Sequence, residues 1–525
     1  KVYNNSQIKN YLAKEYKNFN NQIIDLDKKF LIKDEKKQFS GEELRIFQHC
    51  FGYSIEDLEL ILHPMVEDSK EATGSMGDDT PLAVLSDKYR PLYHFFRQNF
   101  SQVTNPPIDS LRENKVMSLK TRFGNLGNIL DFKNLTEENI YVLDSPILSN
   151  SQFNKFINYF GGNSKILDCT FKKEDNLEYA LINLKNNAEK SVREGIKQLI
   201  LTDKNITKDK LPIPMLLCIG AINSHLTNLG LRGYVSINVQ TGDALDTHSF
   251  ATLIGVGATT VNPYLAFDSI HQRYSKMLFG NLSFDECVSR YIKSVNLGLL
   301  KIMSKMGISV LSSYRGGCNF ETVGLSRTLV KDFFPGILSK ISGIGLNGIE
   351  KKIRDIHFDS FQSNSKVLPI GGIYKYRKNG ETHQYQGKLI HLIQSAVTQN
   401  SYDIYKKYVH GIYNLKPINL RDLIDFKIKK PINIDEVEPV SSIMKRFGSG
   451  SMSHGALSKE AHETLAIGMN RIKGASCSGE GGEDEKRFKI KENGDSENSR
   501  VKQIASARFG VTINYLNNCN EIEIK

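Results

Sequence analysis

Two glycine-rich turns near the end of the chain carry the residue types best suited to chemistry. Residues 449–455 read Ser-Gly-Ser-Met-Ser-His-Gly and lead into a predicted helix, with Ser458 as its N-cap and Glu460 in its first turn. Residues 479–483 read Gly-Glu-Gly-Gly-Glu, where bare backbone N–H groups suit an anion and the carboxylates suit a cation. For each turn, the alternative is a tight connection that binds nothing.

In their order along the chain, these turns resemble the start of the flavin-binding domain of the glutamate synthase large chain. Two flanking blocks belong to the match, residues 443–447 (Ile-Met-Lys-Arg-Phe) and residues 502–512 (Lys-Gln-Ile-Ala-Ser-Ala-Arg-Phe-Gly-Val-Thr). Six further blocks resemble the central domain of the same enzyme: residues 71–83, 104–109, 143–147, 167–170, 261–266 and 313–317. The resemblance therefore covers the chain almost from end to end.

The resemblance implies part of an oxidoreductase that makes glutamate. The whole enzyme would condense glutamine-derived ammonia with 2-oxoglutarate and reduce the resulting 2-iminoglutarate with hydride from reduced FMN. Electrons would come from NAD(P)H, through a small partner subunit or a fused domain, or from ferredoxin. A 3Fe–4S cluster would have its ligands outside this chain, as would the amidotransferase domain and the C-terminal domains. The chain alone is therefore expected to be inactive. The alternatives are another FMN-dependent barrel oxidoreductase and a non-catalytic scaffold or ammonia-channel fragment.

The resemblance also implies roles for single residues. Glu483 would be catalytic, because a carboxylate stabilises a nearby cation such as an iminium. Gly479 and Met76 would join Glu483 in the substrate site. The FMN site would comprise Gly450, Ser451, Met452, Ser453, Lys502, Gln503, Ser506 and Arg508. The alternatives are a solvated charge run over residues 483–487, a core position for Met76 and a surface ion pair for Arg508.

The cysteines and histidines predict no metal site. No two of the seven cysteines form a Cys-x-x-Cys pair, which argues against a zinc ribbon or a disulfide scaffold. That usage favours a reducing compartment, so we expect an intracellular protein of the cytoplasm or an organelle, not a secreted one. His454 and Cys477 differ from the residues that the resemblance leads us to expect, which puts details of the flavin pocket in question.

Composition excludes several classes of partner. The net charge of +11 is spread over scattered lysines without interleaved aromatic residues, so we expect no nucleic-acid partner. The longest apolar run, residues 211–222, is too short to cross a bilayer and contains two prolines, so we expect no membrane partner.

Strand-like and helix-like patterns alternate between residues 141 and 314. The β-rich runs are residues 141–143, 165–167, 198–201, 215–219, 234–239, 259–261 and 308–311. The clearest helix spans residues 284–306, with its apolar side chains on one face. This alternation predicts βαβ units around a mostly parallel sheet, with ligand sites at the carboxyl ends of the strands.

The predicted fold class is α/β in two parts. A mostly parallel α/β central domain is followed by the first strands and helices of a truncated (β/α)8 FMN-binding barrel, since fewer than the roughly 250 residues of a whole barrel remain. The expected divisions are residues 1–45 after a missing amidotransferase domain, 46–355 for the central domain, 356–430 for a helical linker and 431–525 for the partial barrel. A polar, tyrosine-rich helical pattern marks residues 375–425.

Overall fold

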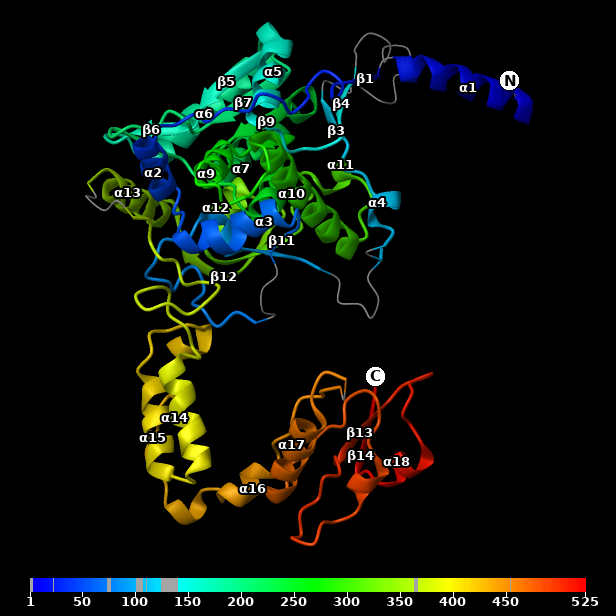
Figure 1. Cartoon of the computed structure of the whole chain (residues 1–525), viewed down its shortest axis with the longest axis vertical. Coiled ribbons are helices and arrows are strands. Elements are labelled where there is room, and N and C mark those ends of the chain that lie inside the picture. Colours follow the sequence, from blue (N-terminus) through cyan, green and yellow to red (C-terminus); the bar gives the residue numbers. More distant parts are fainter. Residues whose placement is uncertain are drawn as a thin grey trace. The chain divides into compact units, whose positions relative to one another are not determined.

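The chain forms two compact units, Lys1–Ile424 and Asp425–Lys525 (Figure 1). The computed structural model describes residues 3–21, 23–72, 77–100, 107–109, 111–123, 140–362, 367–453 and 455–525. Both units mix helices with parallel strands, which confirms the predicted α/β class. Among the helices of these ranges, none is both long and apolar enough to cross a membrane.

A four-stranded parallel sheet lies at the centre of the first unit. Its strand order is β10 (Thr260–Asn262), β9 (Ser236–Gln240), β7 (Gln198–Thr202) and β5 (Ser164–Asp168). The crossover helices are α6 (Leu177–Arg193), α7 (Met215–Asn228) and α8 (Thr247–Val256). These are the predicted βαβ units, and strands β5, β7, β9 and β10 overlap four of the predicted β-rich runs.

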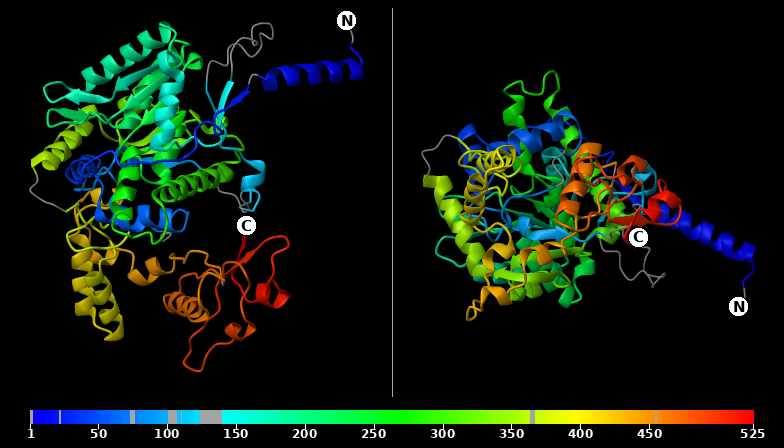
Figure 2. Two further views of the ribbon diagram at one scale, coloured as in Figure 1. Left: turned by 45° about the horizontal axis from the view of Figure 1, so that its top comes forward. Right: turned by 90° about the horizontal axis from the view of Figure 1, so that it is seen from below.

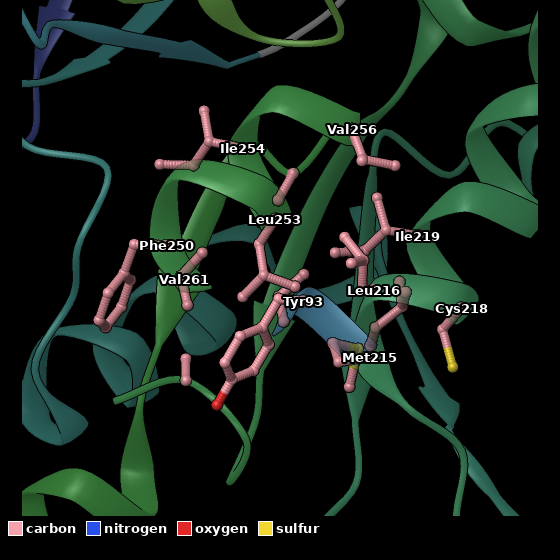
Figure 3. Packing of buried hydrophobic residues seen from close by; sticks show 14 of the residues in the cluster. Tyr93, Met215, Leu216, Cys218, Ile219, Phe250, Leu253, Ile254, Val256 and Val261 are labelled. Atoms are coloured by element: carbon pink, nitrogen blue, oxygen red, sulfur yellow. The ribbon is translucent and has the colours of Figure 1, made fainter. Parts of the chain in front are cut away.

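The core of this unit forms where helices α7 and α8 pack together with the sheet. Figure 3 shows Leu216 and Ile219 of α7 beside Leu253 and Val256 of α8, with Val261 of β10 close by. All five side chains are at most 1% exposed. Helix α10 (Phe284–Met306) covers the assembly with one apolar face, and its bounds confirm the predicted helix.

Two of the predicted strands are wrong. Residues 215–219 begin helix α7, because an apolar run this short does not distinguish a strand from a helix that is buried on all sides. Residues 308–311 follow the left-handed cap Gly307 and form a single bridge, Val310 to Ser118, before the short helix α11 (Leu311–Tyr314).

Smaller sheets surround the central one. The three-stranded sheets are β1 (Ile23–Asp25), β4 (Ile140–Leu143) and β3 (Thr121–Phe123), and β12 (Leu338–Ile344), β11 (Phe320–Leu325) and β2 (Phe96–Gln98). Strand β6 (Thr170–Lys172) pairs with β8 (Lys210–Pro212). The remaining helices of eight or more residues before residue 363 are α1 (Asn5–Asn21), α2 (Gly41–Cys50), α5 (Asn150–Phe160), α9 (Tyr264–Tyr274) and α13 (Leu346–Gln362). Figure 2 shows α1 extending away from the sheets of this unit.

Buried charged side chains connect residues 367–385 with the rest of the first unit. The Glu56 carboxylate accepts hydrogen bonds from three successive N–H groups, the first of them that of Ile373 at 2.6 Å. Arg90 and Glu381 form a buried ion pair at 3.0 Å. After this segment come helices α14 (Gly387–Thr398) and α15 (Tyr402–Tyr413), which pack together as a hairpin and confirm the predicted helical pattern.

The second unit adds parallel segments in chain order. Gly448 bridges Ala475, Cys477 bridges Val501, and strand β13 (Val501–Ile504) pairs with β14 (Glu521–Ile524), all in parallel. Helix α17 (Lys459–Arg471) connects the first two segments, and α18 (Ile513–Asn517) connects the last two. Helix α16 (Val440–Met444) precedes them. That this order is the start of a (β/α)8 barrel stays a prediction.

Candidate functional site

The carboxyl ends of the parallel segments bring the two glycine-rich turns together. Parallel strands that follow one another in a sheet end at the same edge. The segments that end there lead into residues 449–453, residues 478–483 and residues 505–510. Both turns that the sequence singled out therefore lie at one edge, the edge at which open α/β sheets place their ligands.

Helix α17 begins at the predicted N-cap. The Ser458 hydroxyl accepts a hydrogen bond from the Ala461 N–H at 3.3 Å. His462 and Ala466 form the buried face of this helix. Its apolar residues Ala461, Leu465, Met469 and Ile472 line an open groove together.

The glycines of the second turn allow three backbone segments to pack directly on one another. Gly479 has φ +64, and a Cβ atom there would lie 2.2 Å from the Met452 carbonyl oxygen. A Cβ at Gly482 would lie 2.2 Å from the Gly510 carbonyl oxygen. The turn is therefore fixed against residues 449–453 on one side and against residues 505–510 on the other.

Glu483 lies in a buried cluster of charges. Its carboxylate pairs with Lys502 at one oxygen and with the Arg487 guanidinium, 3.1 Å away, at the other. The side chains of Glu483 and Lys502 are fully buried and that of Arg487 is 2% exposed. The solvated charge run that was the alternative for residues 483–487 is therefore wrong for Glu483 and Arg487.

The Lys502 amine is saturated by protein acceptors. Besides Glu483, it donates to the Asn498 side-chain oxygen at 2.5 Å and to the Ser499 carbonyl at 2.9 Å. Burial lowers the pKa of Lys502, and the neighbouring Glu483 carboxylate opposes that shift. An ammonium group has three protons, and all three are used here. The predicted contact of Lys502 with FMN stays a prediction.

The other face of strand β13 carries a second polar cluster. Successive residues of a strand point to opposite faces, so Gln503 faces away from Lys502. On the Gln503 side, the Ser451 hydroxyl lies 3.1 Å from both the Cys477 sulfur and a Glu523 carboxylate oxygen. Glu523 is also hydrogen-bonded to the Gln503 side chain, which contributes to lowering the pKa of Glu523.

The remaining predicted cofactor residues lie around this edge. Arg508 pairs with Glu480 at 3.1 Å, so the ion pair considered as its alternative role is present. Gly450 and Ser506 are exposed, while Met452 and Ser453 are half-buried. Met76 and His454 lie outside the described residues.

Sequence reasoning missed two members of the charged cluster, His462 and Arg487. Arg487 stands in a run of charged residues that is typical of a solvated loop, and His462 stands on a predicted helix outside both glycine-rich turns. The structure shows that His462 contacts Arg487 and that Arg487 in turn pairs with Glu483. In the part of the chain that the structure describes, no three His, Cys, Asp or Glu side chains gather as a metal site would need.

A second buried polar centre lies at the carboxyl edge of the central sheet in the first unit. Asp203 follows β7, and its carboxylate accepts hydrogen bonds from the hydroxyls of Thr241 at 2.5 Å and Tyr264 at 2.8 Å. The Thr241 oxygen also lies 3.1 Å from the Asp243 carboxylate. Burial, and then the charge of Asp243, raise the pKa of Asp203 to about 8.

The raised pKa predicts that this centre makes stability depend on pH. Between about pH 4, where a free aspartate titrates, and pH 8, the folded chain binds a proton that the unfolded chain has released, so stability falls as pH rises. The expected slope is about 1.4 kcal/mol per pH unit. Asp203→Asn should remove the contribution of Asp203, because an amide does not titrate, whereas Asp243, whose pKa burial raises to about 6, still contributes below that pH. Urea unfolding midpoints from pH 5 to pH 9 measure the slope. The control is Asp168→Asn, an exposed carboxylate that pairs with Lys210, and equal slopes in both variants would contradict the assignment.

Comparison with known families gives two matches. Residues 47–326 match the glutamate synthase central domain, and residues 383–525 match a conserved region in glutamate synthase. Together these matches include both polar centres described above.

Curated relatives match over nearly the whole chain. A glutamate synthase [NADPH] large chain of Azospirillum brasilense is 51% identical over 100% of this chain and 35% of its own length. One of Bacillus subtilis is 44% identical over 94% of this chain and 32% of its own length. A ferredoxin-dependent glutamate synthase of Pyropia yezoensis is 39% identical over 100% of this chain and 36% of its own length. The chain thus spans about a third of the length of the curated relatives it matches.

Proposed function

Because a glutamate synthase family model matches more than half of it, the chain belongs to the glutamate synthase family, and we propose that it forms the central domain and the start of the FMN-binding barrel of a glutamate synthase large chain. One observation carries this proposal: the two glycine-rich turns meet at the carboxyl edge of the parallel segments. The buried charges of Glu483, Lys502 and Arg487 lie beside them. The parallel order of the segments supports the barrel.

The whole enzyme would convert 2-oxoglutarate and ammonia from glutamine into glutamate. Ammonia adds to the keto carbon and water leaves, which gives 2-iminoglutarate. Bound FMN in its reduced form supplies the hydride for the imine carbon. The residues of this chain would bind 2-oxoglutarate, exclude water and hold the imine where that hydride can reach it.

The charged cluster suits an anionic substrate. Two buried cations, Arg487 and Lys502, pair with one carboxylate, Glu483, so these three side chains keep one positive charge at the end of the glycine turn. The N–H groups of the turn and this charge together favour a carboxylate of 2-oxoglutarate. The Glu483 carboxylate limits the net positive charge of these three side chains to one. We also propose that this carboxylate stabilises the iminium form of the substrate.

The polar face of strand β13 suits a flavin. Ser451 and Gln503 offer donors and acceptors on one face, as a flavin ring requires, and the exposed Gly450 backbone lies open beside them. Arg508 and Ser506 follow at the next turn. Lys502 points to the opposite face and fits the substrate side better than the cofactor side.

The electron donor and the remaining parts of the enzyme are also proposed from the relatives. The names of the relatives contain either NADPH or ferredoxin as the electron donor, and one of these two donors would reduce the flavin of this protein. A 3Fe–4S cluster and an amidotransferase domain would belong to parts of the protein outside residues 1–525, and an NAD(P)H-oxidising subunit or domain would accompany the NADPH form.

The direct test follows nitrogen through the reaction. The full-length protein is incubated with glutamine labelled with ¹⁵N at the side-chain amide, 2-oxoglutarate and a reduced donor, either NADPH or ferredoxin. We expect the label in the α-amino group of newly formed glutamate and FMN in the purified protein. Label that stays in free ammonia with both donors, or a protein that binds no flavin, would contradict the proposal.

A further inference from the structure

The imidazole of His462 lies between the charged cluster and the point where the two glycine-rich turns meet. One ring nitrogen, Nδ1, lies 2.9 Å from the Arg487 guanidinium, and the other, Nε2, lies 3.0 Å from the Ser478 carbonyl oxygen. The residue is 2% exposed. Its surroundings therefore decide which nitrogen carries the proton.

The hydrogen bonds allow one protonation state. A guanidinium is only a donor, so the Nδ1 atom of His462 must accept from Arg487 and carry no proton. A carbonyl oxygen is only an acceptor, so Nε2 must donate its proton to Ser478. The ring is therefore neutral and protonated at Nε2.

The same ring contacts both turns. The Met452 carbonyl is a second backbone acceptor near the imidazole, and it is the atom against which Gly479 packs. Ser478 stands directly before Gly479. His462 thus contacts the backbone of each turn where the turns touch.

Arg487 extends this connection to Glu483. Its guanidinium donates to the Glu497 carbonyl through Nε at 2.9 Å and through Nη2 at 2.8 Å, and it reaches Glu483 at 3.1 Å. These contacts fix the guanidinium between a backbone carbonyl, the ring of His462 and the carboxylate.

We infer that His462 and Arg487 are positioning residues that hold the two glycine-rich turns and the Glu483 carboxylate in one fixed arrangement. This inference rests on the proposed function, because the turns are the proposed substrate and flavin contacts. It adds two residues that act through others and touch no reactant.

The arrangement has a consequence for activity at low pH. A second proton on His462 would sit at Nδ1, opposite the positive charge of Arg487, whereas the Ser478 and Met452 carbonyls and the more distant Glu483 carboxylate favour the protonated ring. Burial and the Arg487 charge lower the pKa of His462. When the ring is protonated at a pH below that value, its bond to Arg487 is lost while the bond to Ser478 stays, so Arg487 and Glu483 are no longer fixed against the turns and the KM for 2-oxoglutarate should rise.

The test compares two replacements of His462 in the full-length protein, with ammonia and 2-oxoglutarate as substrates. Glutamine offers one acceptor and one donor on a single group at every pH, whereas leucine offers neither. We expect His462→Leu to lower kcat/KM by up to about 100-fold, because a small misplacement of reacting groups costs that much. His462→Gln should recover at least about a tenth of the wild-type value and should lose the rise in KM at low pH. Thr464→Ala, an exposed position on the same helix, is the control.

A second measurement needs no activity. The 525-residue chain is labelled with ¹⁵N-histidine, and the His462 signals are identified by their loss in His462→Gln. Proton–nitrogen correlation should show a proton on Nε2 and none on Nδ1. A proton on Nδ1 would overturn the inference, as would equal kcat/KM values for the Gln and Leu variants. If the wild-type protein makes no glutamate, the proposed function fails and the tautomer assignment is judged by this spectrum alone.

Discussion

Replacing Glu483 by glutamine should destabilise the second unit by about 3–5 kcal/mol, because two buried cations would lose the carboxylate with which both of them pair. The buried positive charges of Lys502 and Arg487 would remain, and neither would then be balanced by a carboxylate at residue 483. Hydrogen exchange of the segments around residues 476–503, measured by mass spectrometry on the 525-residue chain, reports this loss locally. In the full-length protein, glutamate formation should fall together with it.

A residue of the same type in the same turn provides the control. Glu480 is 44% exposed and pairs with Arg508 and Lys525 at the surface. Glu480→Gln should change local stability little, because ion pairs at the surface contribute little. The double variant Glu483→Gln with Lys502→Met removes one of the unbalanced cations, so it should be more stable than the sum of the two single changes predicts. Equal exchange rates for Glu483→Gln and Glu480→Gln would show that the buried cluster does not determine local stability.

Replacing Gly479 by alanine should reduce glutamate formation by about 100-fold or more, since it moves the two glycine-rich turns apart. The new methyl group would lie 2.2 Å from the Met452 carbonyl oxygen, and the residue would also keep a positive φ of +64. The first effect forces the backbone to shift, and shifts of about 1 Å at a reacting site cost this much. The measurement is kcat/KM of the full-length Gly479→Ala variant, in which we expect the loss to appear. Flavin content is measured on the same preparation.

The second unit offers a control with the same backbone strain and no collision. Gly494 has φ +83, and a Cβ atom there would meet nothing within 4 Å. Gly494→Ala should therefore show only the cost of the left-handed conformation, about 1 kcal/mol of stability, with little change in activity. If both alanine variants keep wild-type activity, close contact between the turns is not required.

Long periodic elements were predictable from the sequence, and short apolar runs were not. Helix α10 has one apolar face over 23 residues, a period that only a helix satisfies. The run at residues 215–219 has no such period, and its burial on all sides comes from neighbours that the sequence does not reveal. Local capping was readable as well, because Ser458 bonds within its own first turn.

The candidate site was predictable only in part, for a related reason. Glycines at positions that require φ > 0 appear in the sequence as a motif, and so the turn at residues 479–483 could be located. Its surroundings depend on which residue of a strand faces which side. Lys502 and Gln503 are neighbours in sequence and lie on opposite faces, and Arg487 is buried against His462 and Glu483, which its charged neighbours in sequence do not indicate.

The order of the parallel segments in the second unit also bears on how the chain is made. Each segment pairs with the one synthesised just before it, so every strand finds a formed edge as it leaves the ribosome. Contacts of this kind are short in sequence separation for a parallel sheet, which favours rapid folding. Until the next strand arrives, however, the newest edge is open. Strand β14, with Ile522 51% and Ile524 81% exposed, is an exposed apolar strand of this kind, and it favours self-association of residues 1–525 when they are expressed alone.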